Sequence, residues 1–143
     1  MRYLLDTNVL SELRKSRRLA DPSVRRWVGQ QRASGLFISV ITVMEIEVGI
    51  RRLERRDRQQ SQRLRGWLEN DVLDVFSARI LPVDLAVARH ATRLHVPDPS
   101  PERDALIAAT AILHELTIVT RNVADFDGRG VPVVDPWSAA AES

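Results

Sequence analysis

The sequence predicts an α/β protein with a mostly parallel sheet of four to five strands in a three-layer sandwich, flanked by helices on both faces. Short runs of apolar, often β-branched residues recur along the 143 residues. These runs are continuously apolar rather than alternating, which is typical of strands covered on both faces. Segments with helical periodicity separate them, as in βαβ units of parallel sheets.

The predicted strands are short, and the last of them contains a proline. Because proline cannot donate to a central ladder, Pro132 places the last strand at an edge of the sheet. The strands are predicted at residues 3–6, 36–40, 80–83, 117–120 and 131–134.

The predicted helices have recognisable start signals. Pro22 follows Asp21, and Asp84 precedes another helical pattern, so both aspartates are expected to be N-caps. Ser100 before Pro101 predicts a third cap. The helices are predicted at residues 22–34, 42–56, 58–76, 85–96 and 101–116. The third should bury one apolar stripe, formed by Leu64, Trp67, Leu68, Val72, Val75 and Phe76.

Composition indicates one soluble domain at residues 1–137 and a C-terminal tail at residues 138–143. Hydrophobic residues make up 44% of the chain and charged residues 28%, which is ordinary for a globular protein. There are no cysteines, so disulfides and thiolate metal sites are excluded. Charges interrupt every apolar run, and the chain enters its first predicted strand at once, so we expect a cytoplasmic protein without a membrane span.

The first strand ends on a carboxylate in the stretch YLLDTN, which raises the possibility of a site. Asp6 could be a turn or cap residue, because Asp, Thr and Asn are common there. In open α/β sheets, however, ligands bind beyond the carboxyl ends of the strands. Asp6 lies at such an end, and so does Asp125, which follows the predicted strand at 117–120.

Two further acids are candidates for the same site. Asp104 falls in or just past the first turn of the helix at 101–116, where the positive helix end favours a carboxylate, as it would for Glu102. Glu45 stands in a strongly apolar neighbourhood, where a carboxylate is costly unless it is paired. Glu47 should face roughly the opposite way on the helix. Each acid alone has a structural explanation.

Gathered in one crevice, carboxylates would repel one another and raise each other's pKa, and a divalent cation would remove that penalty. With no Cys and only three His, the donors favour the oxygen-binding ions Mg²⁺ or, alternatively, Mn²⁺. The sequence therefore predicts a magnesium site if the acids converge.

Four motifs stand out along the chain: LLDTNVLSE (4–12), Ser39…Thr42…Glu45…Gly49, RDALIAATAILHELTIVTRN (103–122) and NVADF (122–126). They resemble motifs of PIN-domain ribonucleases, and most closely those of VapC-type toxins of type II toxin–antitoxin systems. The resemblance runs from residue 3 to about 137, and the segment from Asp104 to Phe126 is its most specific part. In place of His114-Glu115, members of this family commonly carry Gly, so the helix exit is expected to differ locally.

The resemblance implies a PIN-like, Rossmann-like fold and a metal-dependent endoribonuclease, a hydrolase that leaves 3′-hydroxyl and 5′-phosphate ends on RNA. It also implies inhibition by a cognate antitoxin and assembly into a homodimer or a toxin–antitoxin hetero-oligomer. Carried over by position, the catalytic and metal-binding acids are Asp6, Glu45, Asp104 and Asp125, with Asp127 as an alternative to Asp125. Asn8, Thr120 and Asn122 match substrate-contacting or supporting polar positions.

Two other readings of the function stay open. The protein could be a stand-alone PIN nuclease in RNA processing, or a non-catalytic protein-binding module. Seven arginines between residues 51 and 65 could guide an RNA backbone, or could form a solvated face or a contact with the antitoxin or a second subunit.

Overall fold

The computed structural model describes residues 1–138, so most of the predicted tail, residues 139–143, lies outside the described part. Its centre is a five-stranded sheet in the order β3-β2-β1-β4-β5, with every neighbouring pair parallel. The strands are β1 (Tyr3–Leu5), β2 (Leu36–Ser39), β3 (Ile80–Leu81), β4 (Thr117–Val119) and β5 (Val133–Val134).

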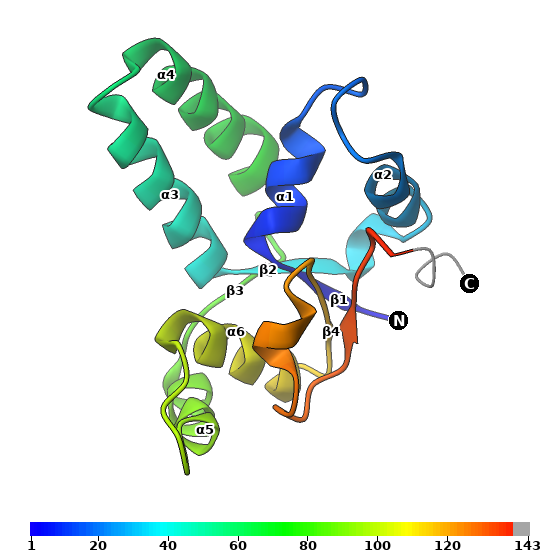
Figure 1. The fold of residues 1–143 in the computed structure, drawn as a ribbon, viewed down its shortest axis with the longest axis vertical. Helices are drawn as coiled ribbons and strands as arrows, with labels where there is room; N and C mark the ends of the chain where they lie inside the picture. The colour runs from blue at the N-terminus through cyan, green and yellow to red at the C-terminus, as the bar shows by residue number, and fades with distance from the viewer. Residues whose placement is uncertain (139–143) are drawn as a thin grey trace.

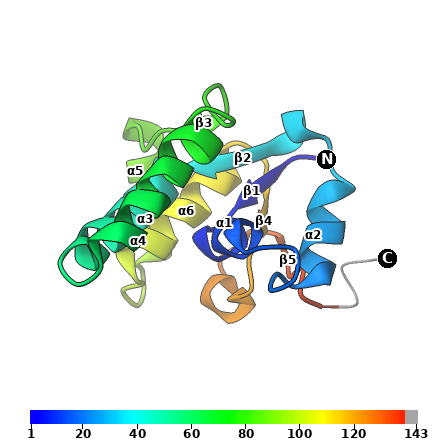
Figure 2. The same ribbon diagram turned by 90° about the horizontal axis from the view of Figure 1, so that it is seen from above.

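Six α-helices of the described residues cover the two faces of the sheet. In Figures 1 and 2, α1 lies between the paired helices α3 and α4 on one side and α2 on the other, while α5 and α6 pack beneath the sheet. None of the helices within residues 1–138 is long and apolar enough to cross a membrane. The helices are α1 (Thr7–Arg14), α2 (Pro22–Gly29), α3 (Val40–Glu54), α4 (Arg58–Trp67), α5 (Leu85–Leu94) and α6 (Glu102–Leu113).

Separate apolar clusters fill the two layers. On the α1–α4 side, Val9, Trp27 and Ile50 pack with Leu5 and Val119 of the central strands. On the other side, alanine-rich α6 packs closely against the sheet through residues such as Ile107 and Ala108. The three-layer α/β prediction is confirmed, and the sheet is wholly parallel.

The predicted strands and most predicted helix starts are confirmed within a few residues. β1 ends directly before Asp6, which is the N-cap of α1. Asp21 and Asp84 cap α2 and α5 through backbone N–H groups of Ser23 and Val87. β5 is an edge strand, as Pro132 predicted.

Two helix predictions are wrong in detail. The helix predicted at 58–76 gives way after Trp67 to a π-helical segment, Leu68–Leu73. The wider π turn shifts the helical register, so Val75 is 56% exposed instead of buried. Ser100 is not a cap, because its hydroxyl donates to the carbonyl of Leu94 and α6 begins one residue later, with Pro101 as N-cap.

The exit of α6 contains Glu115 at a position where the resemblance leads one to expect a glycine nearby. Glu115 has a φ of 56°, in the left-handed region that glycine adopts without strain. The chain therefore keeps the turn that leads from α6 into β4, although an ordinary L-residue occupies it. The local departure of His114-Glu115 leaves the path of the backbone into the central sheet intact.

Candidate active site

A cavity of about 400 Å³ opens at the carboxyl ends of the central strands. It lies where the loops after β1 and β4 meet the N-terminal part of α6 and one face of α3. Three of the four predicted acids line it, together with two of the predicted polar residues. The lining residues are Asp6, Thr7, Asn8, Ser11, Glu12, Lys15, Glu45, Asp104, Arg121, Asn122 and Trp137.

Asp6 is the most constrained acid of the cavity. Its carboxylate accepts hydrogen bonds from the Thr7 N–H (2.9 Å), the Thr120 hydroxyl (2.8 Å) and the Asn8 amide (3.3 Å). Burial nevertheless raises the pKa of Asp6, and the charge of Asp125 adds to this; the hydrogen bonds act in the opposite direction. Asp6 is therefore held in one orientation, in surroundings that disfavour an isolated negative charge.

The hydroxyl of Thr120 is fully buried and connects the two strand ends. It donates to Asp6 and accepts from the Asn8 amide (3.0 Å) and from the Asn122 N–H (3.0 Å). Asn8 also accepts from the N–H of Arg121 at 3.1 Å. The predicted supporting residues Asn8, Thr120 and Asn122 thus form one network around Asp6.

Glu45 reaches the cavity from α3, and two residues fix it there. One carboxylate oxygen accepts from the Thr7 hydroxyl at 2.8 Å, and the other lies 3.8 Å from a guanidinium nitrogen of Arg103. Glu47 points elsewhere and pairs with Arg51 at 3.8 Å. Glu45 therefore faces the cavity and Glu47 does not, as their spacing on the helix led us to expect.

Asp104 lies in the first turn of α6, close to the other acids. Burial raises the pKa of Asp104, and the negative charges of Asp125, Asp6 and Glu45 raise it further, while Arg129 opposes them. Asp125 does not line the cavity, but its charge acts on both Asp6 and Asp104. Asp127 is not among the charges that raise the pKa of either acid.

Arg129 ties the loop that carries Asp125 to the segment before α6. Its guanidinium donates to the carbonyls of Asp125 (3.0 Å) and Leu94 (3.4 Å) and to the hydroxyl of Ser100. Because Ser100 precedes Asp104 by one helical turn, these contacts connect the positions of two of the acids.

The donor chemistry of the cavity suits a hard divalent cation, although the acids do not form a complete cage. Within residues 1–138, no three His, Asp or Glu side chains approach closely enough to hold a metal ion between them. Mg²⁺ characteristically binds through one or two carboxylates and keeps several of its waters. Mutual repulsion at Asp104 and burial at Asp6 are the conditions that a cation would relieve. The residues therefore fit Mg²⁺ or Mn²⁺ bound partly through water.

Sequence reasoning missed several residues of the cavity. Thr7 was part of the DTN motif, but its bond to Glu45 depends on how α1 and α3 pack. Glu12 is buried, and the pKa of its carboxyl is lowered by hydrogen bonds from the Asp21 N–H (2.8 Å) and the Lys15 ammonium (3.0 Å). Trp137 packs against the core and also lines the cavity. No local pattern signalled these contacts, because distant segments create them.

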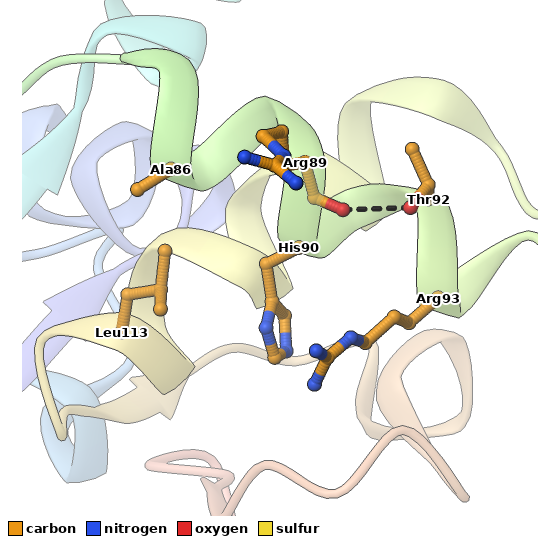
Figure 3. Close-up of a pocket in the computed structure, with 6 residues that line it drawn as sticks. All are labelled: Ala86, Arg89, His90, Thr92, Arg93 and Leu113. Carbon is orange, nitrogen blue, oxygen red and sulfur yellow. Dashed lines mark hydrogen bonds between the residues drawn. The ribbon is translucent and has the colours of Figure 1, made fainter.

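A second hollow of the described residues has a different character. It measures about 480 Å³ and lies along α5, where Figure 3 shows His90 and Arg93 projecting from the helix and Leu113 of α6 nearby. None of its six lining residues is acidic, and none belongs to the predicted site. The smaller, acid-lined cavity is therefore the candidate active site.

Comparison with known proteins identifies the protein family of this chain. A family model described as the PIN domain matches residues 3–127. That match covers most of the chain, and it includes Asp6, Glu45, Asp104 and Asp125. This chain belongs to the PIN-domain family.

Individual relatives span nearly the whole chain. The VapC ribonuclease Y4jK of Sinorhizobium fredii is 33% identical over 142 residues, covering 96% of this chain and 99% of its own. The crystal structure of FitAcB from Neisseria gonorrhoeae superimposes with a TM-score of 0.84 at 32% identity, covering 94% of this chain and 98% of that one. A toxin–antitoxin complex from Klebsiella pneumoniae gives a TM-score of 0.68 at 32% identity, with 94% and 97% coverage.

Proposed function

We propose that this protein is an endoribonuclease that requires Mg²⁺ or Mn²⁺ and acts in the cytoplasm as the toxin of a toxin–antitoxin pair. The observation that carries the proposal is the convergence of Asp6, Glu45 and Asp104, from three separate segments, on one cavity. Asp125 lies within electrostatic reach of two of them. The similarity to a VapC ribonuclease along 96% of the chain supports RNA as the substrate.

Each acid has a role that follows from its surroundings. Asp6 and Asp104 would be the principal ligands of the cation, because their carboxylates carry the largest unrelieved penalty for negative charge. Glu45 and Asp125 would complete the site by holding the waters of the ion. When bound, the cation would lower the pKa of a water and neutralise charge that develops on the phosphate.

The reaction would be hydrolysis of a phosphodiester bond. Water would add to phosphorus, and the bond from phosphorus to the 3′ oxygen would break, leaving 3′-hydroxyl and 5′-phosphate ends. No side chain of the cavity needs to act as a nucleophile. Thr120 and Asn8 would keep Asp6 oriented, and Thr7 with Arg103 would keep Glu45 oriented, so that the carboxylates need no rearrangement when substrate binds.

A groove beside the active site is suited to an inhibitory protein segment. It measures about 290 Å³ and lies between α1, α3 and α4, with an apolar floor that includes Ile46, Leu64 and Trp67. Thr7, Ser11 and Glu45 line both this groove and the acid cavity. A helix or extended segment of an antitoxin in the groove would therefore lie directly against Glu45, beside the acid cavity. The similarity to a solved toxin–antitoxin complex supports such a partner.

Cleavage by the isolated protein tests the enzymatic proposal. The purified chain should cut total bacterial RNA in Mg²⁺ but not in excess EDTA, and Asp104→Asn should abolish most of the cleavage. Asp104 accepts no hydrogen bond from the residues described, so this change should leave the fold intact. Glu102→Gln is the matched control in the same helical turn and should cleave normally. Parental cleavage in EDTA, or by Asp104→Asn in Mg²⁺, would overturn the assignment.

Co-expression with the product of the adjacent gene tests the antitoxin proposal. We expect the two proteins to co-purify, and the complex to cleave RNA far more slowly than the separated chain. Reversing the charges of Arg55, Arg56 and Arg58 shows which partner the arginine-rich segment serves. Loss of antitoxin binding with unchanged cleavage excludes the RNA-guide role. An active nuclease without any such partner would instead indicate a stand-alone PIN nuclease.

A further inference from the structure

The acid cavity contains a guanidinium group that forms no ion pair with an acid of the described residues, although its charge acts on the buried carboxylate of Glu12. Its two cationic lining residues are Lys15 and Arg121. The Lys15 ammonium lies 3.0 Å from the carboxylate of Glu12 and is committed to it. The side chain of Arg121 makes neither a hydrogen bond nor an ion pair with the residues that the structure describes, and Arg121 is exposed. Its donors and one of its faces are therefore available to a ligand.

The guanidinium of Arg121 lies over an aromatic ring. The guanidinium carbon lies 5.4 Å from the centroid of the Trp137 ring. Trp137 is half-buried against the core, and its backbone N–H donates to the side chain of Asp135 at 2.9 Å. A cation over an aromatic face is favourable, so Trp137 supports the guanidinium from beneath and limits the directions in which it can point.

The Arg121–Trp137 pair is coupled directly to the catalytic acids. The side-chain oxygen of Asn8 accepts from the N–H of Arg121 at 3.1 Å, and its amide nitrogen donates to Asp6 at 3.3 Å. One side chain therefore fixes the backbone of Arg121 and contacts the carboxylate of Asp6. Any group that binds on Arg121 is held next to the acids.

The chemistry of this pair suits an uncharged, flat group. Without a cation, the carboxylates of the cavity repel phosphates, whereas a nucleobase carries no charge and has two flat faces. Nucleobases stack on arginine guanidinium planes and on aromatic rings, and proteins recognise single-stranded RNA largely in this way. Bases within a duplex are already stacked, so only an unpaired base could enter.

We propose that Arg121 and Trp137 form a nucleobase-binding subsite for single-stranded RNA. A base beside the scissile phosphate stacks on the open face of the Arg121 guanidinium, and Trp137 supports the opposite face. This inference rests on the proposed ribonuclease function and specifies how the same cavity holds its substrate. It makes Arg121 a substrate-contacting residue and Trp137 a positioning residue that acts through it.

Binding without catalysis provides the test. Fluorescence anisotropy in EDTA would compare a labelled uridine oligomer with an abasic ribose–phosphate oligomer of equal length. Both probes carry the same backbone charge, so repulsion by the acids affects them equally. The parental protein should bind the uridine oligomer about tenfold more tightly, which is the order of magnitude expected for one stacked base. Equal affinity for the two probes would overturn the proposal.

Variants separate stacking from charge. Arg121→Lys keeps the charge but loses the flat surface, so it should bind the abasic oligomer as the parent does and lose the preference for bases. Arg121→Ala should weaken binding of both probes and also lose the preference. Arg89→Ala, at an arginine of α5 outside the cavity, should retain it. A preference that survives in Arg121→Lys would contradict the stacking role.

Trp137 needs its own pair of variants, because it also packs on the core. Trp137→Phe keeps an aromatic support and should preserve most of the preference, whereas Trp137→Leu should reduce it. Circular dichroism and thermal melting would identify loss of fold. In Mg²⁺, Arg121→Lys should raise KM for single-stranded RNA while changing kcat little. A base preference that is the same in folded Trp137→Leu and Trp137→Phe would overturn the positioning role.

The two proposals fail in distinguishable ways. If Asp104→Asn still cleaves RNA in Mg²⁺, the catalytic assignment fails, but the base preference in EDTA can still be measured. If cleavage depends on the acids and the parental protein shows no base preference, only the subsite is overturned.

Discussion

The buried hydroxyl of Thr120 donates a 2.8 Å hydrogen bond to the carboxylate of Asp6, 114 positions earlier in the chain. The same oxygen accepts from Asn8 and from the N–H of Asn122, so one small side chain connects the ends of β1 and β4. Because the hydroxyl makes all three of these hydrogen bonds, we expect the contribution of Thr120 to depend on its hydroxyl rather than on the volume of its side chain.

Replacing Thr120 by valine should therefore damage both stability and activity. The change keeps the shape but removes one hydrogen bond each from Asp6, Asn8 and Asn122, and the loss of a partner by a buried polar group costs about 1–3 kcal/mol. Residues that orient metal ligands typically contribute about 10–100-fold to activity. Thr120→Ser retains the hydroxyl and should recover most of the loss. Denaturant unfolding and RNA cleavage rates would measure both effects, and equal behaviour of the valine and serine variants would contradict this role.

Asp104→Asn should stabilise the cation-free protein while it abolishes cleavage. The substitution removes a charge that is repelled by Asp125, Asp6 and Glu45. Asp104 is only half-buried, so solvent screening limits the gain to between a few tenths and about 1 kcal/mol. Urea unfolding in EDTA near neutral pH would measure it. Glu102→Gln is the control and should show no gain, because Glu102 interacts favourably with the helix end.

The response to Mg²⁺ should depend on pH. The folded-state pKa values of Asp6 and Asp104 lie above those of the unfolded chain, so the native protein takes up these protons first as the pH falls. The penalty of the two charges is present above the folded pKa values and disappears below them. Glu12, with a lowered pKa, works in the opposite direction.

Protons and cations compete for Asp6 and Asp104, so the rise in Tm that Mg²⁺ causes should be largest near neutral pH and should become smaller as the pH falls. Differential scanning fluorimetry with and without Mg²⁺ at each pH would measure this rise in Tm. The titration of Glu12 affects both measurements, so its contribution largely cancels when they are subtracted. Asp104→Asn should show a smaller rise at every pH. A rise in Tm that does not change with pH would count against binding at these carboxylates.

Glu115→Gly should stabilise the fold without affecting catalysis. Glu115 has a φ of 56°, and the left-handed conformation is unfavourable by about 1 kcal/mol or more for a residue with a Cβ. Glycine relieves this strain but loses more conformational entropy on folding, so we expect a net gain of about 0.5 kcal/mol. Glu115→Ala keeps the Cβ and should show no gain. Thermal unfolding would distinguish the two variants.

Much of the fold could be predicted because its signals are local. Continuous apolar runs indicated the strands, and Asp21 and Asp84 marked helix starts correctly. The family assignment, made on motifs from Leu4 to Phe126, is confirmed by the match to the PIN-domain model. The π-helical segment after Trp67 was missed because the apolar spacing of residues 64–76 fits an ordinary α-helix equally well.

The acids of the site could be proposed from strand ends and motifs, but their supports could not. The bond from Thr7 to Glu45 depends on the packing of α1 against α3, and Arg129 reaches its acceptors across a loop. The position of Trp137 beside Arg121 depends on β4 and β5 pairing in parallel. Such contacts join residues that lie far apart in the sequence, so they could not be predicted from the residue types and local patterns alone.

The central position of β1 has a consequence for synthesis on the ribosome. β1 is synthesised before β2 and β4, yet it lies between them, and the N–H of Asp6 donates to the carbonyl of Val119 at 3.0 Å. A nascent chain that has not yet released β4 lacks both this bond and Thr120, and it also lacks Asp125. Long-range pairing of this kind forms late. The acids proposed for catalysis can therefore come together only after β4 and the segment up to Asp125 have left the ribosome.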